Sequence, residues 1–121
     1  MVIVDTDAGV EHFGRGVEQG CDIILLTVDP SYESIRLAEK AGTLSEGMQK
    51  PLYLILNRVR DNIKETLLNS IDAEKVIAAV PENEEIFKTS LNGNELNLQL
   101  TEIEELADKI TGKLDRNVLK K

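Results

Sequence analysis

Two carboxylates and a hydroxyl follow the first apolar run of the chain. Asp5, Thr6 and Asp7 come directly after residues 2–4, a run with the composition of a buried strand, and Gly9 lies two residues further on. Open α/β sheets bind their ligands beyond the carboxyl ends of the strands. Mg²⁺ prefers oxygen ligands, and a glycine lets a backbone N–H approach a phosphate closely. The segment therefore suits a magnesium and phosphate site, and the same spacing equally suits an ordinary polar turn.

Two later apolar runs also end in side chains that could contact a ligand. Asn57 and Arg58 follow residues 52–56, and Pro81 follows residues 76–80. An asparagine amide both donates and accepts hydrogen bonds and can therefore recognise a purine base, while a proline at a strand end forms a flat wall. Taken singly, each position is typical of an ordinary strand exit.

Four short apolar runs predict the sheet that would position these residues. Residues 2–4, 23–28, 52–56 and 76–80 are continuous β-branched or Leu-rich runs rather than alternating ones, which is typical of strands covered on both faces. Helical spacing follows three of the runs, with Asp29 as the expected N-cap and Pro30 in the first turn of the first of these helices. A turn at residues 92–94 precedes a last amphipathic helix. The order β-α-β-α-β-α-β-α-α predicts one α/β domain over residues 1–121, with a mainly parallel sheet flanked by helices.

Composition narrows the classes of partner. The 121 residues include 22 acidic and 14 basic ones, and the net charge of -8 disfavours nucleic acid and anionic membranes. No apolar run approaches the roughly 18 residues of a membrane span, and no signal peptide is evident, so we expect a cytoplasmic protein. The chain has one cysteine, Cys21, and one histidine, so we expect a buried, inert thiol and no tight nickel or zinc site.

Residues 5–15, with the sequence DTDAGVEHFGR, resemble the switch II segment of the MinD/ParA-like P-loop ATPases that have a deviant Walker A motif. Within that family they are most similar to the CooC type, the nickel-insertion maturation factors of carbon monoxide dehydrogenase. Residues 28–34 (VDPSYES) resemble the next strand exit of CooC-type proteins, residues 57–59 (NRV) the strand end that contacts adenine, and residues 80–81 (VP) the loop that closes over the base. The resemblance spans nearly the whole chain but only the C-terminal part of the family domain. A buried-type strand at residue 2 likewise leads us to expect further residues upstream.

The resemblance implies ATP or ADP and Mg²⁺ as ligands, and a metalloenzyme client as a partner. It implies that Asp5 holds a magnesium-bound water, that Gly9 senses the γ-phosphate, and that Asn57 bonds adenine. Arg58 and Pro81 would frame the base. The remaining residues of the motif are expected in a switch or an interface: Thr6, Asp7, Glu11, His12 and Arg15.

Three departures from the family pattern change what we expect of the chain. The 121 residues contain no Walker A loop, which would cradle the phosphates, so we expect negligible ATP hydrolysis from this chain alone. The Cys-x-Cys nickel pair of the family is also absent, so nickel binding is not expected. Asn83 stands where the family usually has Asp after the proline.

The missing P-loop strand also bears on assembly. In the resembled family that strand lies between the strands that correspond here to residues 2–5 and 23–28. Their unpaired edges would bind another strand. We expect either direct pairing of the two or, preferably, a homo-oligomer that covers them.

Other readings remain open. Without its P-loop, the chain could be a non-catalytic α/β interaction module. A Rossmann-type dinucleotide-binding domain is a remote alternative, because Gly14, Gly16 and Gly20 lie far beyond their strand and their last spacing is one residue too long. A receiver-like module built on Asp5 and Asp7 would want a lysine at a later strand end.

Overall fold

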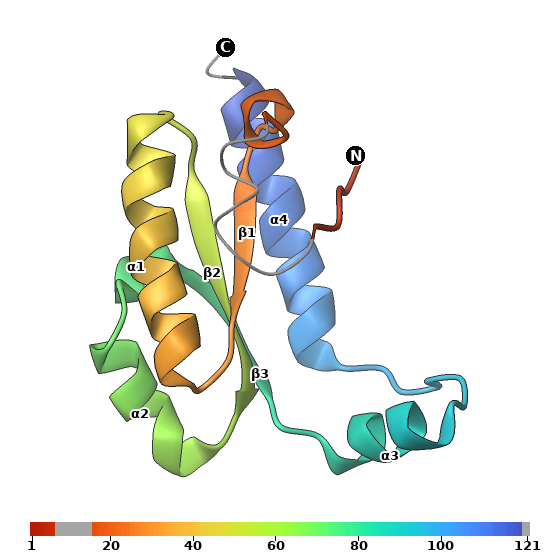
Figure 1. Ribbon diagram of the computed structural model, residues 1–121. Coiled ribbons are helices and arrows are strands. Elements are labelled where there is room, and N and C mark those ends of the chain that lie inside the picture. The colour runs from red at the N-terminus through yellow and green to blue at the C-terminus, as the bar shows by residue number, and fades with distance from the viewer. Residues whose placement is uncertain (7–15, 120–121) are drawn as a thin grey trace.

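The computed structural model describes residues 1–6 and 16–119, and the side chains of the last helix as far as Arg116. Figure 1 shows the course of the chain. Three strands are present in the described residues: β1 (Ile24–Val28), β2 (Leu52–Val59) and β3 (Val76–Pro81). The α-helices are α1 (Tyr32–Gly47), α2 (Asp61–Asn69), α3 (Glu84–Asn92) and α4 (Thr101–Leu119), and two 3-10 turns are η2 (Glu18–Gly20) and η3 (Ala73–Lys75).

The strands form a parallel sheet in the order β1-β2-β3. Leu26 lies opposite Leu54 across the first pair, and Ile55 lies opposite Ala78 across the second. Helices α1 and α2 lie on one face of the sheet and α4 lies on the other, while α3 lies beyond the carboxyl end of β3 (Figure 1). The predicted α/β class, with a parallel sheet flanked by helices, is confirmed.

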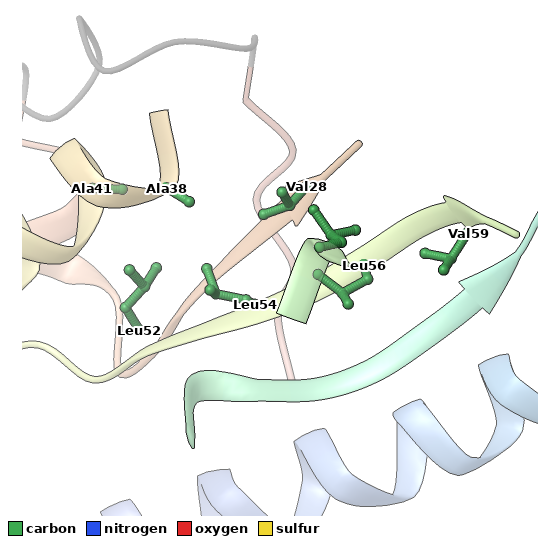
Figure 2. Packing of buried hydrophobic residues seen from close by; sticks show 8 residues of the cluster. Val28, Ala38, Ala41, Leu52, Leu54, Leu56 and Val59 are labelled. Atoms are coloured by element: carbon green, nitrogen blue, oxygen red, sulfur yellow. The ribbon is translucent and has the colours of Figure 1, made fainter. Parts of the chain in front are cut away.

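The core lies between the sheet and α1. Alternate residues of β2 are buried, and Figure 2 shows their side chains on the same side of the sheet as the small residues of α1. Leu56 and Val28 have no exposed surface. Because α1 presents Ala38 and Ala41 to the sheet, its backbone can approach the leucines closely. Burial of this aliphatic cluster is the main source of stability in a chain so poor in aromatic residues.

Helix α4 covers the opposite face with long, polar-tipped side chains. The Lys109 ammonium donates to the backbone oxygen of Ile77 at 2.8 Å. The Lys113 ammonium lies 4.1 Å from the centroid of the Tyr53 ring, within the range of a cation–π interaction. The aliphatic stems of such lysines cover apolar surface while their charged ends find polar partners.

The predicted strand at residues 2–4 is wrong. These residues form no strand in the structure, and their exposed fractions run from 57% to 88%. A strand exists only where a neighbour completes its backbone hydrogen bonds, and here the direct pairing with β1 that was one of our expectations does not form. Of the residues between this run and β1, the described ones contain only the short turn η2 in place of a predicted helix.

The N-cap of α1 is Ser31 and not Asp29. Ser31 has an extended backbone, with φ -143° and ψ 153°, and its hydroxyl accepts a hydrogen bond from the Ser34 N–H at 3.2 Å. The prediction failed because the Asp29 carboxylate is bound by side chains of β2. The turn predicted at residues 92–94 is confirmed, because Gly93 ends α3 in the left-handed conformation. The expected burial of Cys21 is wrong, because this residue is only partly buried.

Within the described ranges, no helix combines the length and the apolar character needed to cross a bilayer.

Truncation of Leu56 tests the position of the core. Leu56→Ala should lower the free energy of unfolding by about 2–5 kcal/mol, because a closely packed site cannot collapse around the lost methyl groups. Urea denaturation measures the change. Leu44→Ala is the matched control, since Leu44 is 40% exposed on α1, and it should change stability by less than about 1 kcal/mol. Equal effects of the two substitutions would contradict this core.

Candidate functional site

The carboxyl edge of the sheet joins Asp29 to two consecutive residues of β2. The parallel register places Val28 opposite Leu56, so the next residues of both strands meet. Asn57 Nδ2 donates to Asp29 Oδ1 at 3.2 Å. Arg58 donates from Nε to Asp29 Oδ1 at 3.3 Å and from Nη2 to Asp29 Oδ2 at 3.1 Å. The guanidinium thus grips both carboxylate oxygens, the geometry in which an arginine–carboxylate pair is strongest.

A bulge at the end of β2 makes this arrangement possible. Consecutive side chains of a regular strand point to opposite faces, so Asn57 and Arg58 could not both reach one carboxylate. Between Leu56 and Val59, however, β2 advances three residues while β3 advances two, from Ala79 to Pro81. The extra residue bends the strand end and redirects its side chains.

Arg58 has an unusual backbone conformation at this bulge. Its φ of 53° lies in the left-handed region, which costs a residue with a side chain about 1–2 kcal/mol. The two hydrogen bonds to Asp29 help to hold it there. Backbone strain of this kind is concentrated at functional sites, so it marks this strand end as a place to look for one.

The end of β3 completes the edge. Pro81 lies opposite Val59, and the Glu82 N–H donates to the Val59 oxygen at 3.2 Å. Pro81 is therefore fixed beside the bulge that carries Asn57 and Arg58. Of the residues singled out in the sequence, these three are brought to one edge of the sheet.

Next to Pro81, the side chains of Arg60 and Glu82 form an exposed ion pair. The hydrogen bond from Arg60 lowers the pKa of Glu82, and the same bond raises the pKa of Arg60. A lowered carboxyl pKa stabilises the fold above the ordinary range of glutamate, and that contribution is lost as the pH falls through the lowered pKa. The pair thus ties the start of α2 to the loop after β3 at neutral pH.

Asn83 caps α3. Its Oδ1 accepts from the Glu85 N–H at 2.9 Å and from the Ile86 N–H at 3.1 Å. Asparagine and aspartate are about equally good N-caps, so the Asn at a position where the resembled family usually has Asp keeps the start of this helix intact.

A cavity of about 360 Å³ opens beside this edge, between α2, β3 and α4. Its apolar wall includes Val59, Ala79 and Pro81. Charged residues of both signs surround it: Asp61, Lys64, Glu102, Glu105 and Lys109. Three of these residues are acidic and two are basic, so the cavity presents both carboxylate and ammonium groups.

The other predicted site residues are not assembled here. Asp5 and Thr6 lie in the exposed segment 1–6, outside the sheet. The remainder lie outside the described residues: Asp7, Gly9, Glu11, His12 and Arg15. In the ranges that the structure does describe, no group of three or more His, Cys, Asp or Glu side chains is placed to hold a metal ion.

Sequence reasoning missed Asp29 as a member of the site. The signal was present, because Asp29 ends one apolar run in the same way that Asn57 ends the next. The structure also disfavours the alternative of a Rossmann-type dinucleotide-binding domain. Its glycines should follow a strand, and the described residues before Gly16 form none.

Comparison of glycine and alanine at position 58 tests the left-handed backbone. Both variants lose the guanidinium, so the loss of the ion pair cancels between them. Arg58→Gly should be more stable than Arg58→Ala by about 1 kcal/mol in urea denaturation, because glycine adopts positive φ without strain. At Thr27, an exposed position of β1, the order should reverse, with alanine the more stable by about 0.5–1 kcal/mol. Alanine proving more stable at both positions would refute the conformation.

Comparisons with known proteins show what the chain as a whole is similar to. No family model matches the chain. An uncharacterized ATP-binding protein of Methanocaldococcus jannaschii is 50% identical over 111 residues, which are 92% of this chain and 45% of the relative. A second ATP-binding protein of that organism is 35% identical over 81% of this chain and 40% of its own length. The carbon monoxide dehydrogenase accessory protein CooC of Rhodospirillum rubrum is 26% identical over 66% of this chain and 31% of its own length.

Among solved structures, the MinC:MinD cell division protein complex of Aquifex aeolicus contains a similar chain. The TM-score is 0.61 at 23% sequence identity, over 80% of this chain and 48% of that one. This chain thus spans less than half the length of the relatives that it matches. Over most of its own length the chain is similar to ATP-binding proteins and, more distantly, to CooC, and its α/β unit shares the fold of a chain in the MinC:MinD complex.

Proposed function

We propose that this chain forms the base-binding part of a MinD/CooC-type ATPase, with Asn57, Arg58 and Pro81 in contact with adenine. The observation that carries this is the meeting of the three residues at the carboxyl edge of a parallel sheet, where open α/β folds bind their ligands. The ATP-binding proteins to which the chain is similar support the same ligand.

Each of the three residues has a distinct role in this proposal. The Asn57 amide hydrogen-bonds the edge of the base. The planar guanidinium of Arg58 stacks on its face, as arginine does on flat π-systems. Pro81 forms a rigid apolar wall on the side of β3. Asp5 and Gly9 contact the magnesium and phosphate end of the nucleotide. The remaining residues of the motif link that end to a partner: Thr6, Asp7, Glu11, His12 and Arg15.

Hydrolysis belongs to the whole protein and not to this chain by itself. Phosphoryl transfer depends on positioning and charge neutralisation, and the 121 residues contain no Walker A loop to supply them. We further propose an accessory role toward a metalloenzyme client, on the similarity to CooC. One cysteine and one histidine do not make a nickel site, so the contribution of this chain to such a role is nucleotide binding.

Nucleotide binding can be measured on the 121-residue chain. ADP titrated into the ¹⁵N-labelled protein should shift the backbone amides at the ends of β2 and β3, and Asn57→Ala should weaken binding by up to about tenfold, the worth of one hydrogen bond. Asn69→Ala, at the exposed end of α2, is the matched control and should bind as the wild type does. Incubation with ATP and Mg²⁺ should release no phosphate above background. If ADP shifts no resonances, or if Asn57→Ala binds it unchanged, the proposed site is wrong.

A second candidate function, assembly, is favoured by the free edge of β1. This strand pairs with β2 on one side, and within the described sheet nothing pairs with its other side. Leu25 of the same strand is 37% exposed, and the apolar residues 2–4 are more exposed still. Unpaired strand edges and exposed apolar surface both favour association, so we propose that the chain forms a homo-oligomer through this edge.

Light scattering at micromolar concentration tests the assembly. The wild type should have the mass of a dimer or a larger oligomer. Leu25→Lys places a charge at an exposed position of this edge strand and should shift the mass toward that of one chain. Leu44→Lys makes the same exchange at a similarly exposed leucine of α1, and should leave the mass unchanged. If the wild-type protein has the mass of a single chain, the proposed oligomer is wrong.

A further inference from the structure

We propose that Asp29 is a positioning residue that makes the site select adenine over guanine. It does so by fixing which atom of the Asn57 amide faces the ligand. This role of Asp29 rests on the proposed function, because it assumes that Asn57 contacts a base. It concerns a residue that directly follows β1, whereas the proposed base contacts lie in β2 and β3.

The orientation of Asn57 follows from the chemistry of its neighbour. An ionised carboxylate only accepts hydrogen bonds, so the side of the amide that faces Asp29 must be the NH₂ group. The structure has this arrangement, with Nδ2 lying 3.2 Å from Asp29 Oδ1. The reverse orientation would set two oxygens against each other and would leave the NH₂ group without this partner. The amide oxygen is therefore turned away from Asp29, where it can accept a hydrogen bond from a ligand.

Asp29 is itself held in place from two directions. Arg58 binds both of its carboxylate oxygens, through Nε at 3.3 Å and Nη2 at 3.1 Å. Its backbone oxygen accepts from the Ser31 N–H at 2.8 Å in the tight turn that leads into α1. A side chain fixed at both its backbone and its carboxylate can orient a neighbour, because it cannot move with it. Arg58 therefore serves Asn57 through Asp29, in addition to any contact of its own with the base.

A free amide oxygen distinguishes the two purines. Adenine carries an amino donor at the position where guanine carries a carbonyl oxygen. Asn57 Oδ1 accepts from the amino group of adenine. Against guanine the same oxygen would face a second acceptor, which loses the hydrogen bond and adds repulsion. Without Asp29 the amide could rotate by half a turn and present its NH₂ group to guanine instead, so the preference would disappear.

The test compares purine nucleotides on the 121-residue chain by the same NMR titration. The wild type should bind ADP about tenfold more tightly than GDP or IDP, the worth of one hydrogen bond gained against one lost. Asp29→Asn replaces the carboxylate by an amide of the same shape that can both donate and accept, and should bring the ADP to GDP ratio close to one. Glu39→Gln is the matched control: it removes the exposed ion pair with Arg36 on α1 and should keep the wild-type ratio.

A series of ligands gives a second measurement that needs no variant, should Asp29→Asn fail to fold. Purine riboside diphosphate lacks a group at the discriminating position, so the wild type should bind ADP most tightly, purine riboside diphosphate less tightly and IDP least. Equal affinities across the series, or an unchanged ratio in a folded Asp29→Asn protein, would overturn the role of Asp29 while leaving nucleotide binding intact. If ADP itself does not bind, or if Asn57→Ala binds it unchanged, the proposed base site fails and the inference fails with it.

Discussion

The central strand β2 is the constraint on which the rest of the unit depends. It is hydrogen-bonded on both sides, to β1 and to β3, and it supplies the leucines that pack against α1. Its two faces are covered differently, by a close aliphatic contact with α1 on one side and by lysine stems from α4 on the other. Because one rigid element carries both the core and the strand end with Asn57 and Arg58, the position of these two residues is set by the same packing that keeps the chain folded.

The polar side chains of the candidate site lie where the regular part of β2 ends. As far as Leu56, β2 follows the alternation of a buried strand, and the bulge that follows releases the chain from it. At that point the carboxylate of Asp29, which directly follows β1, binds two consecutive side chains of β2. Precision at such a site comes from its attachment to the core and not from the loop itself, since residues placed on rigid elements hold their geometry better than residues on loops.

Much of this unit could be predicted from the sequence, because continuous apolar runs and helical spacing are local patterns. The runs at 23–28, 52–56 and 76–80 all form strands, and Asn57, Arg58 and Pro81 share the expected edge. The absence of a strand at residues 2–4 could not be predicted, because the composition of these residues suits a strand whether or not a neighbouring strand is present to pair with it. The role of Asp29 depends on the bulge in β2, and a one-residue shift of register between neighbouring strands leaves no mark in either sequence. Its interpretation as an N-cap was locally sensible and was overridden by a contact 28 residues away.

The attachment of α4 has a consequence for the motions of the unit. Of its described side chains only Leu106 is buried, and the contacts with the sheet at Ile77 and Tyr53 are made by lysine ammonium groups. Contacts of this kind are easily exchanged for water, whereas the leucine cluster under α1 is not. We therefore expect detachment of α4 to cost less free energy than loss of the α1 layer, and it would uncover one wall of the cavity beside Pro81. The two faces of the sheet are thus held with unequal strength, by buried aliphatic packing on the side of α1 and by a partly exposed interface on the side of α4.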